Sequence, residues 1–188
     1  MASTNMGTIY AGALRNTRAL EKQGLEQMER QLSRLERARV KVLVTGAGGQ
    51  LGRALLARAP AGVAVHGLTS TGLDIADAAA VAEYFARERS DLVINAAAYT
   101  AVDQAESEPD RAAAVNDRGV ANLTAGAEAV GARLAHVSTD FVFAGDAARA
   151  YAPDARTGPL GVYGATKLAG EQLAGMYRHD YGLSAATL

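Results

Sequence analysis

Two kinds of hydrophobic pattern alternate along the chain after residue 39. Short runs that are apolar throughout are typical of strands buried on both faces, whereas longer stretches with apolar positions every three or four residues are typical of helices. We expect strands at 41–45, 63–68, 92–96, 133–138 and 183–188. We expect helices between them, at 50–59, 77–89, 109–130 and 164–180.

This alternation predicts an α/β fold with a parallel sheet that is covered by helices on both faces. The expected arrangement is a doubly wound, Rossmann-like sheet with strand order 3-2-1-4-5. A ligand of such a sheet lies across the carboxyl ends of the strands, at the switch point between strands 1 and 4. The last expected strand reaches the final residue, Leu188, so we expect the sheet to be incomplete at the C-terminus.

The first 39 residues follow a different pattern, with seven Arg or Lys and four Glu. Their apolar positions are spaced as on one stripe of an amphipathic helix, at Leu25, Met28, Leu32 and Leu35. Two heptads are too short to hold a coiled coil alone. We therefore expect a helical extension over 1–39 that docks on the domain 40–188 or is partly frayed, with an oligomerising helix as the alternative.

A glycine-rich turn follows the first expected strand. The run from Lys41 leads into glycines at positions 46, 49 and 52 and then into a helical pattern. Such glycines allow a tight turn, close approach of a pyrophosphate and close packing of helix on strand, while the helix N-terminus supplies N–H donors. The run predicts a dinucleotide-binding loop, with a plain turn at 48–49 as the alternative.

Tyr163 and Lys167 form a second motif, after a strand that ends in Ser138, Thr139 and Asp140. Four residues apart on a helix, the two side chains share one face. A phenol has a pKa near ~10, but a neighbouring ammonium favours the phenolate and suits the group to proton transfer. Alone this spacing is more often a solvated pair, but the glycine loop favours carbonyl reduction.

Composition agrees with a single α/β domain that binds a small molecule. The 188 residues are 49% hydrophobic and 21% charged, with a net charge of −1 and no cysteine. Balanced charge gives no field for nucleic acid or an anionic membrane, and no run approaches the roughly 18 apolar residues of a membrane span. The absence of cysteine excludes a disulfide frame, a thiol nucleophile and zinc-finger spacing, and the N-terminus has no apolar signal core, so a cytoplasmic location is expected.

Three acidic residues, Asp103, Glu106 and Glu108, have the chemistry of metal ligands. Acids at the start of a helix are well explained by the helix dipole, so we expect no metal site. The three histidines, His66, His136 and His179, are scattered singly, and we interpret them as structural or surface residues.

With both motifs considered, the chain from Val40 to Leu188 resembles the extended short-chain dehydrogenase/reductase family, and within it the branch of dTDP-4-dehydrorhamnose reductases. The residues that carry the resemblance are 45–52, 73–75, 91–108, 136–143 and 159–171. The most specific stretch is 95–108, because generic members share its Asn-Ala-Ala start but not its acidic Val-Asp-x-Ala-Glu-Ser-Glu continuation.

The resemblance implies a nicotinamide cofactor, NADP(H) or NAD(H). The implied cofactor-binding residues are Gly46, Gly49, Gln50, Leu51, Gly52, Asp74, Ile75, Ala96, Ala97, Ala98, Tyr163 and Lys167. The segment from His66 to Thr71 has no acid to repel a 2′-phosphate and no Arg to bind one, so either cofactor fits, with NADP(H) slightly favoured.

The resemblance also implies the reduction of dTDP-4-dehydro-L-rhamnose to dTDP-L-rhamnose for cell-surface polysaccharide. Tyr163 would protonate the keto oxygen as hydride arrives, and Lys167 would bind the ribose and lower the pKa of the phenol. Thr139 would orient the same oxygen, with Ser138 as the alternative, and Asp140 would lie near the sugar. Asn116 is either a structural or proton-relay residue, as in many members, or a helix-surface residue.

A non-catalytic module, like the regulatory subunits of methionine adenosyltransferase in the same family, is the alternative function. The combination of Tyr163, Lys167 and Thr139 favours the enzyme, since a binding module has no chemical need for all three. The family continues past Leu188 with a domain that closes over the sugar nucleotide. We therefore expect nucleotide binding more firmly than turnover, and a homo-oligomer stays an open alternative.

Overall fold

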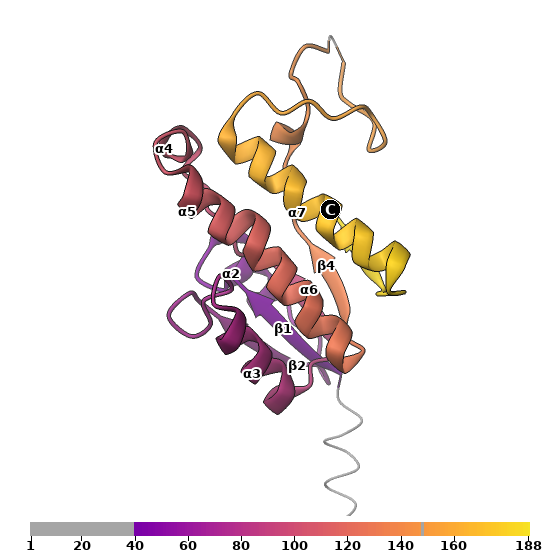
Figure 1. The fold of residues 1–188 in the computed structure, drawn as a ribbon. Helices are drawn as coiled ribbons and strands as arrows, with labels where there is room; N and C mark the ends of the chain where they lie inside the picture. Colours follow the sequence, from indigo (N-terminus) through magenta and orange to yellow (C-terminus); the bar gives the residue numbers. More distant parts are fainter. Residues whose placement is uncertain (1–39, 148) are drawn as a thin grey trace, which may run out of the picture. The chain divides into compact units, whose positions relative to one another are not determined.

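The computed structural model describes residues 40–147 and 149–188, and the helix predicted over 1–39 lies outside the described residues. The described chain forms one parallel five-stranded sheet of order β2-β1-β3-β4-β5 (Figure 1). The strands are β1 (Lys41–Thr45), β2 (Ala64–Leu68), β3 (Leu92–Asn95), β4 (Arg133–His136) and β5 (Ala185–Thr187). Each predicted strand is present, with ends that differ by up to two residues.

The doubly wound arrangement is confirmed, since β1 lies inside the sheet and the chain crosses over from β2 to β3 on the other side of β1. The expected order 3-2-1-4-5 places two strands beyond strand 1 on one side. The observed sheet has one strand, β2, on that side of β1. Residues 69–77, which follow β2, form turns and irregular backbone rather than an outermost strand. β3 therefore pairs directly with β1 and takes the position of the fourth strand in the expected order.

The four predicted helices are present, although the helix expected over 109–130 is divided, and the short helix α4 was not predicted. Their bounds are α2 (Gln50–Ala57), α3 (Ala78–Glu88), α4 (Val102–Ala105), α5 (Pro109–Ala113), α6 (Gly119–Val130) and α7 (Val162–Asp180). A π-helical turn, η1 (Ala114–Arg118), joins α5 to α6, and a short 3-10 turn, η2 (Asp140–Val142), follows β4. No helix in the described part of the chain has the length and apolar character needed to cross a membrane.

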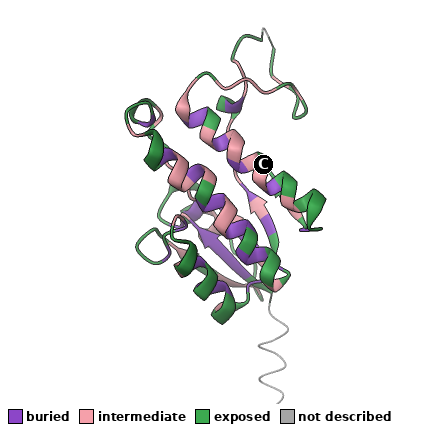
Figure 2. Ribbon diagram, in the orientation of Figure 1, coloured by how far each residue is buried: buried purple, intermediate pink, exposed green. Residues whose placement is uncertain are grey.

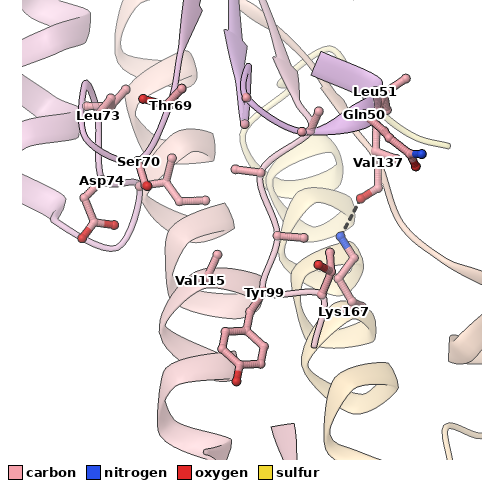
Figure 3. Close-up of a pocket in the computed structure, with 18 of the residues that line it drawn as sticks. Gln50, Leu51, Thr69, Ser70, Leu73, Asp74, Tyr99, Val115, Val137 and Lys167 are labelled. Carbon is pink, nitrogen blue, oxygen red and sulfur yellow. Dashed lines mark hydrogen bonds between the residues drawn. The ribbon is translucent and has the colours of Figure 1, made fainter. Parts of the chain in front are cut away.

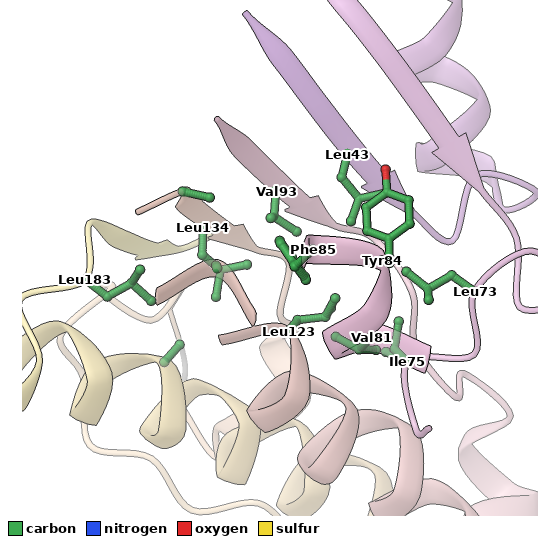
Figure 4. Packing of buried hydrophobic residues seen from close by; sticks show 13 residues of the cluster. Leu43, Leu73, Ile75, Val81, Tyr84, Phe85, Val93, Leu123, Leu134 and Leu183 are labelled. Atoms are coloured by element: carbon green, nitrogen blue, oxygen red, sulfur yellow. The ribbon is translucent and has the colours of Figure 1, made fainter. Parts of the chain in front are cut away.

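One face of the sheet is covered by α3, α6 and α7, which pack side by side (Figure 1). Crossovers between parallel strands are right-handed. The β1-to-β2 connection crosses the sheet in the direction opposite to that of the later connections, so its helix, α2, covers the other face. The main core lies beneath the three helices, where Phe85, Leu123 and Leu134 meet the buried strand residues Leu43 and Val93 (Figure 4). The buried sides of these helices face the strands, and their exposed sides face outward (Figure 2).

Candidate active site

A cleft of about 750 Å³ opens at the carboxyl ends of the first four strands (Figure 3). It lies at the switch point between β1 and β3, where doubly wound sheets bind their ligands. Every predicted cofactor-binding residue except Gly52 lines this cleft. The predicted motifs, which are separated by up to about 120 residues of chain, are therefore brought into one place.

The glycine loop between β1 and α2 forms one side of the cleft. Gly46 has a φ of +68°, and a Cβ there would overlap the backbone of Ala96 and Ala97. A Cβ at Gly52 would overlap the carbonyl of Gly46, so this glycine packs beneath the loop instead of lining the cleft. No side chain caps α2, whose N-cap is Gly49, and its first turn contains no acid. The first N–H groups of α2 are therefore suited to an anion.

Lys167 lies on the opposite side of the cleft with its side chain only 2% exposed. Its Nζ donates a hydrogen bond to the carbonyl of Val137 at 2.5 Å (Figure 3). Burial lowers the pKa of the ammonium to about 8, although the nearby Glu171 opposes the shift. An ammonium has three donors, and Val137 satisfies one of them among the described residues, so Lys167 can donate to a ligand.

Tyr163 lies one turn before Lys167 on α7 and lines the same cleft. The ring is 8% exposed and packs edge-on against Phe141, with 5.5 Å between the ring centroids. This packing fixes the plane of the ring and leaves the phenol at the cleft wall. The predicted pair is therefore present on one helix face.

Two polar side chains from distant segments hold the first turns of α7. The backbone N–H of Val162 donates to Oε1 of Glu106 at 2.7 Å, and Nδ2 of Asn116 donates to Oγ1 of Thr166 at 3.2 Å. Asn116 also bonds both backbone groups of Tyr99, at 2.9 and 3.1 Å. Because Asn116 is 1% exposed, the helix-surface alternative is wrong, and its contacts make it structural.

The three acids predicted at helix starts have different roles. Asp103 lies in the first turn of α4, and Glu108 is the N-cap residue of α5, as expected. Glu106 follows the end of α4 and instead binds the N-terminus of α7. Its position is a consequence of tertiary packing that helix periodicity does not reveal.

The hydroxyl at the cleft wall belongs to Ser138 rather than to Thr139. Oγ of Ser138 is buried without a hydrogen-bond partner among the described residues, and the residue lines the cleft. Oγ1 of Thr139 accepts from the N–H of Phe141 and donates to Oδ1 of Asp140, both at 3.3 Å, which caps η2. Thr139 and Asp140 do not line the cleft. Side chains alternate along the extended backbone that leaves β4, so neighbouring hydroxyls point to opposite sides.

A buried polar network joins three strands at the carboxyl edge of the sheet, where the cleft opens. Thr45 donates to Oδ1 of Asn95 at 2.7 Å, and because this oxygen also accepts from Ala97, Nδ2 of Asn95 donates to Nδ1 of His136 at 3.0 Å. Burial, with a smaller contribution from Lys167, lowers the pKa of His136 to about 3. This histidine is therefore neutral and structural, and its network ties β1, β3 and β4 together.

The sequence did not indicate several residues that line the cleft. The cleft-lining residues to which the sequence analysis assigned no site role are Gly48, Thr69, Ser70, Leu73, Tyr99, Thr100, Arg111, Val115 and Val137. Tyr99 donates to Glu108 at 3.0 Å, and the guanidinium of Arg111 lies 5.6 Å from the centre of its ring. Four of these residues, Thr69, Ser70, Arg111 and Val115, lie outside the motifs, because their place in the cleft depends on how loops and helices meet after the strands are paired.

The chain is similar to a group of sugar-nucleotide reductases. It is 50% identical over 142 residues to dTDP-4-dehydrorhamnose reductase from Mycolicibacterium smegmatis, which covers 74% of this chain and 43% of the relative. A crystal structure of a dTDP-4-dehydrorhamnose reductase from Clostridium acetobutylicum matches with a TM-score of 0.70 at 40% identity, over 71% of this chain and 48% of that one. The enzyme from Bacillus anthracis in complex with NADP matches with the same TM-score of 0.70 at 38% identity, over 72% and 49%.

These matches involve about half of each relative, so the chain spans about half the length of the proteins it resembles. The family profile described as the RmlD substrate binding domain matches residues 40–181, which contain the whole cleft described above. The extent of this match and the identity to the curated relatives lead to one conclusion: the chain belongs to the RmlD substrate-binding domain family.

Proposed function

We propose that this chain supplies the cofactor-binding and proton-donating part of an NAD(P)H-dependent reductase that converts dTDP-4-dehydro-L-rhamnose to dTDP-L-rhamnose. The observation that carries the proposal is the placement of Tyr163 and Lys167 on one face of α7, opposite the glycine loop in a single cleft. The same substrate is supported by the name dTDP-4-dehydrorhamnose reductase of a relative that is 50% identical over 142 residues.

The cleft fits a dinucleotide. Its glycine loop leaves room for a pyrophosphate at the start of α2, because neither Gly46 nor Gly52 tolerates a side chain and no residue caps the helix. At the other end, Lys167 has donors to offer to ribose hydroxyls. When bound, the nicotinamide supplies the hydride that reduces the ketone.

Tyr163 is the proposed proton donor to the keto oxygen. The edge-on packing against Phe141 limits the motion of its ring, and the contacts of Glu106 and Asn116 hold the helix that carries it. Lys167 lies one turn away on the same face of α7, so its ammonium is near the group that gives up the proton. Burial lowers the pKa of this ammonium to about 8.

A hydroxyl after β4 is proposed to orient the same keto oxygen. The resemblance assigns this role to Thr139 and places Asp140 near the sugar, whereas Ser138 has the free buried oxygen at the cleft wall. Parallel Ser138→Ala and Thr139→Val variants separate the two. The larger loss of turnover identifies the orienting hydroxyl.

A non-catalytic regulatory module is disfavoured by the buried ammonium. Burying the charge of Lys167 costs stability, and a module that only presents a surface to a partner gains nothing from that cost. A cytoplasmic location and assembly into a homo-oligomer are further proposals from the sequence.

Two measurements test the proposed function. Calorimetric titration of the chain should detect binding of NADPH or NADH, and the absence of binding by both would reject the proposal. Turnover is measured in a chimera in which residues 40–188 replace the matching part of the Mycolicibacterium smegmatis relative. The chimera should oxidise NADPH only when dTDP-4-dehydro-L-rhamnose is present, with the unaltered relative as the positive control.

A further inference from the structure

The end of the cleft beside β2 is where a dinucleotide-binding sheet distinguishes the two nicotinamide cofactors. An acid after the second strand binds the ribose 2′-hydroxyl of NAD, whereas a nearby Arg accommodates the 2′-phosphate of NADP. In this chain β2 ends at Leu68, and the next two residues, Thr69 and Ser70, line the cleft. Both carry hydroxyls. The Thr69 hydroxyl shares a hydrogen bond of 2.9 Å with the hydroxyl of Thr71, and when it accepts from Thr71 its own O–H can donate to a phosphate.

Asp74 is the one carboxylate among the described cleft-lining residues. Its Oδ1 accepts the backbone N–H of Ala76 at 3.0 Å, so the acid caps its own turn. Asp74 is also separated from the end of β2 by the five residues 69–73, which begin with Thr69 and Ser70. The position beside the strand end is therefore occupied by neutral donors.

An arginine from another element contacts the loop at this end of the cleft, outside the residues that line it. Arg53 lies on α2, and its Nη1 donates to the carbonyl of Gly48 at 2.6 Å. Gly48 lines the cleft and packs against Thr69, since a Cβ built on it would lie 3.3 Å from Cγ2 of that residue. The guanidinium is therefore held beside the turn that faces the two hydroxyls.

The charge of Arg53 is not neutralised among the described residues, because none of their ion pairs includes it. A guanidinium has five N–H donors, and the described residues provide an acceptor for one of them, the Gly48 carbonyl. An exposed guanidinium fixed beside two hydroxyls matches the fork geometry that arginine uses to bind phosphate.

We propose that Arg53, together with Thr69 and Ser70, binds the 2′-phosphate of NADP(H), so that the chain prefers NADP(H) to NAD(H). This inference rests on the proposed function, because it assigns a specificity to the same cofactor site. It also explains why the sequence pattern favoured NADP(H) only slightly: the segment after β2 contains no arginine, and the fold supplies one from the helix after β1.

Calorimetric titration of the full chain tests the inference without any turnover. The probes are NADPH, NADH and the fragment pair 2′,5′-ADP and 5′-AMP, which differ only in the phosphate. The wild-type protein should bind NADPH at least about tenfold more tightly than NADH. Arg53→Ala should weaken NADPH and 2′,5′-ADP by about tenfold and leave NADH and 5′-AMP within about twofold.

Arg58→Ala is the matched control, because it removes the same charge from the exposed C-terminal end of α2, away from the cleft. It should change no affinity by more than about twofold. A second variant, Thr69→Asp, should reverse the preference, since a carboxylate there repels the phosphate and accepts from the 2′-hydroxyl.

Equal binding of NADPH and NADH, or an Arg53→Ala variant that keeps the preference, would overturn this inference and leave the reductase proposal intact. A wild-type chain that binds neither cofactor would overturn both. Equal losses in Arg53→Ala and Arg58→Ala would also overturn it, because they would indicate a general charge effect.

Discussion

The two ends of the cleft are built in opposite ways. At the glycine loop, Gly46 and residues 48–51 form the cleft wall from nearly consecutive backbone, and the small residues Ala96 and Ala97 lie against it. At the reaction end, α7 is held by side chains that are distant in sequence: Glu106 is 56 residues from Val162, Asn116 is 50 from Thr166, and Lys167 is 30 from Val137. The shape of the glycine loop is therefore set by local backbone geometry, whereas the position of α7 depends on tertiary contacts.

This difference predicts how substitutions will act. A change in the glycine loop should affect cofactor affinity by steric or electrostatic means at the substituted residue. A change at the reaction end should affect turnover, because it removes a reacting group or alters the position of α7. The predictions below can contradict or refine this division.

The largest effect is expected for Tyr163→Phe, which should lower turnover in the chimera roughly 10²–10⁴-fold, because only the proton donor is lost. The ring still packs against Phe141, so the Kd for NADPH, measured by titration, should change by less than about threefold. Turnover close to that of the wild type would reject Tyr163 as the acid. A comparable loss of affinity would contradict the division between the two ends.

Gly49→Asp should weaken NADPH binding by about 100-fold, since a carboxylate at the start of α2 repels the pyrophosphate. Gly49→Asn is the matched control, because asparagine has nearly the same size as aspartate without the charge. The asparagine variant should bind NADPH more tightly than the aspartate variant, and the difference measures the electrostatic repulsion. The backbone of Gly49 is extended, with φ −75°, which any residue adopts, and the contact of 3.3 Å that a Cβ would make with the carbonyl oxygen of Gly46 is the same in both variants. Unaltered binding of NADPH by the aspartate variant would place the pyrophosphate elsewhere.

Stability should fall in acid because of His136. The pKa of this imidazole is about 3 in the folded protein and near 6.5 in the unfolded chain. Between these values the unfolded chain binds a proton that the folded protein does not, so the free energy of unfolding falls with pH by up to about 1.4 kcal/mol per unit. Urea unfolding at several pH values measures the slope.

His136→Gln should reduce this slope below pH ~6.5 while keeping an acceptor for Asn95. His179→Gln, at an exposed position on α7, controls for the loss of one imidazole from the unfolded chain. An unchanged slope in His136→Gln would mean that other groups cause the acid sensitivity.

The smallest effect is expected for Glu106→Ala, which removes the acceptor of the Val162 N–H and should lower turnover of the chimera about tenfold. Glu106→Gln retains the acceptor oxygen and should restore most of the turnover, which separates positioning from a need for charge. The Kd for NADPH should change by less than about threefold in both variants. Wild-type turnover in the alanine variant would show that α7 needs no such contact.

The part of the fold that periodicity encodes was predictable. Each strand and each of the longer helices of the described chain was expected near its observed position, because buried parallel strands and amphipathic helices have distinct repeats. The short helix α4 was not predicted, since one turn is too short to show a hydrophobic period. The π-helical turn at 114–118 was not predicted, since its wider turn changes the hydrogen bonding and not the hydrophobic spacing. The arrangement after β2 was also not predicted: residues 69–77 are irregular and add no strand, so β2 lies at the edge of the sheet.

Motifs determined most of the candidate site, because the glycine loop and the pair Tyr163 and Lys167 follow from spacing along one strand–turn–helix unit or one helix. Tertiary structure alone decided which neighbouring hydroxyl, Ser138 or Thr139, reaches the cleft. It also decided that Arg53 lies beside Thr69 and that Glu106 caps α7. Spacing in the sequence fixes which side chains share an element, whereas contacts between elements depend on the pairing and crossing of the strands, which no local pattern encodes.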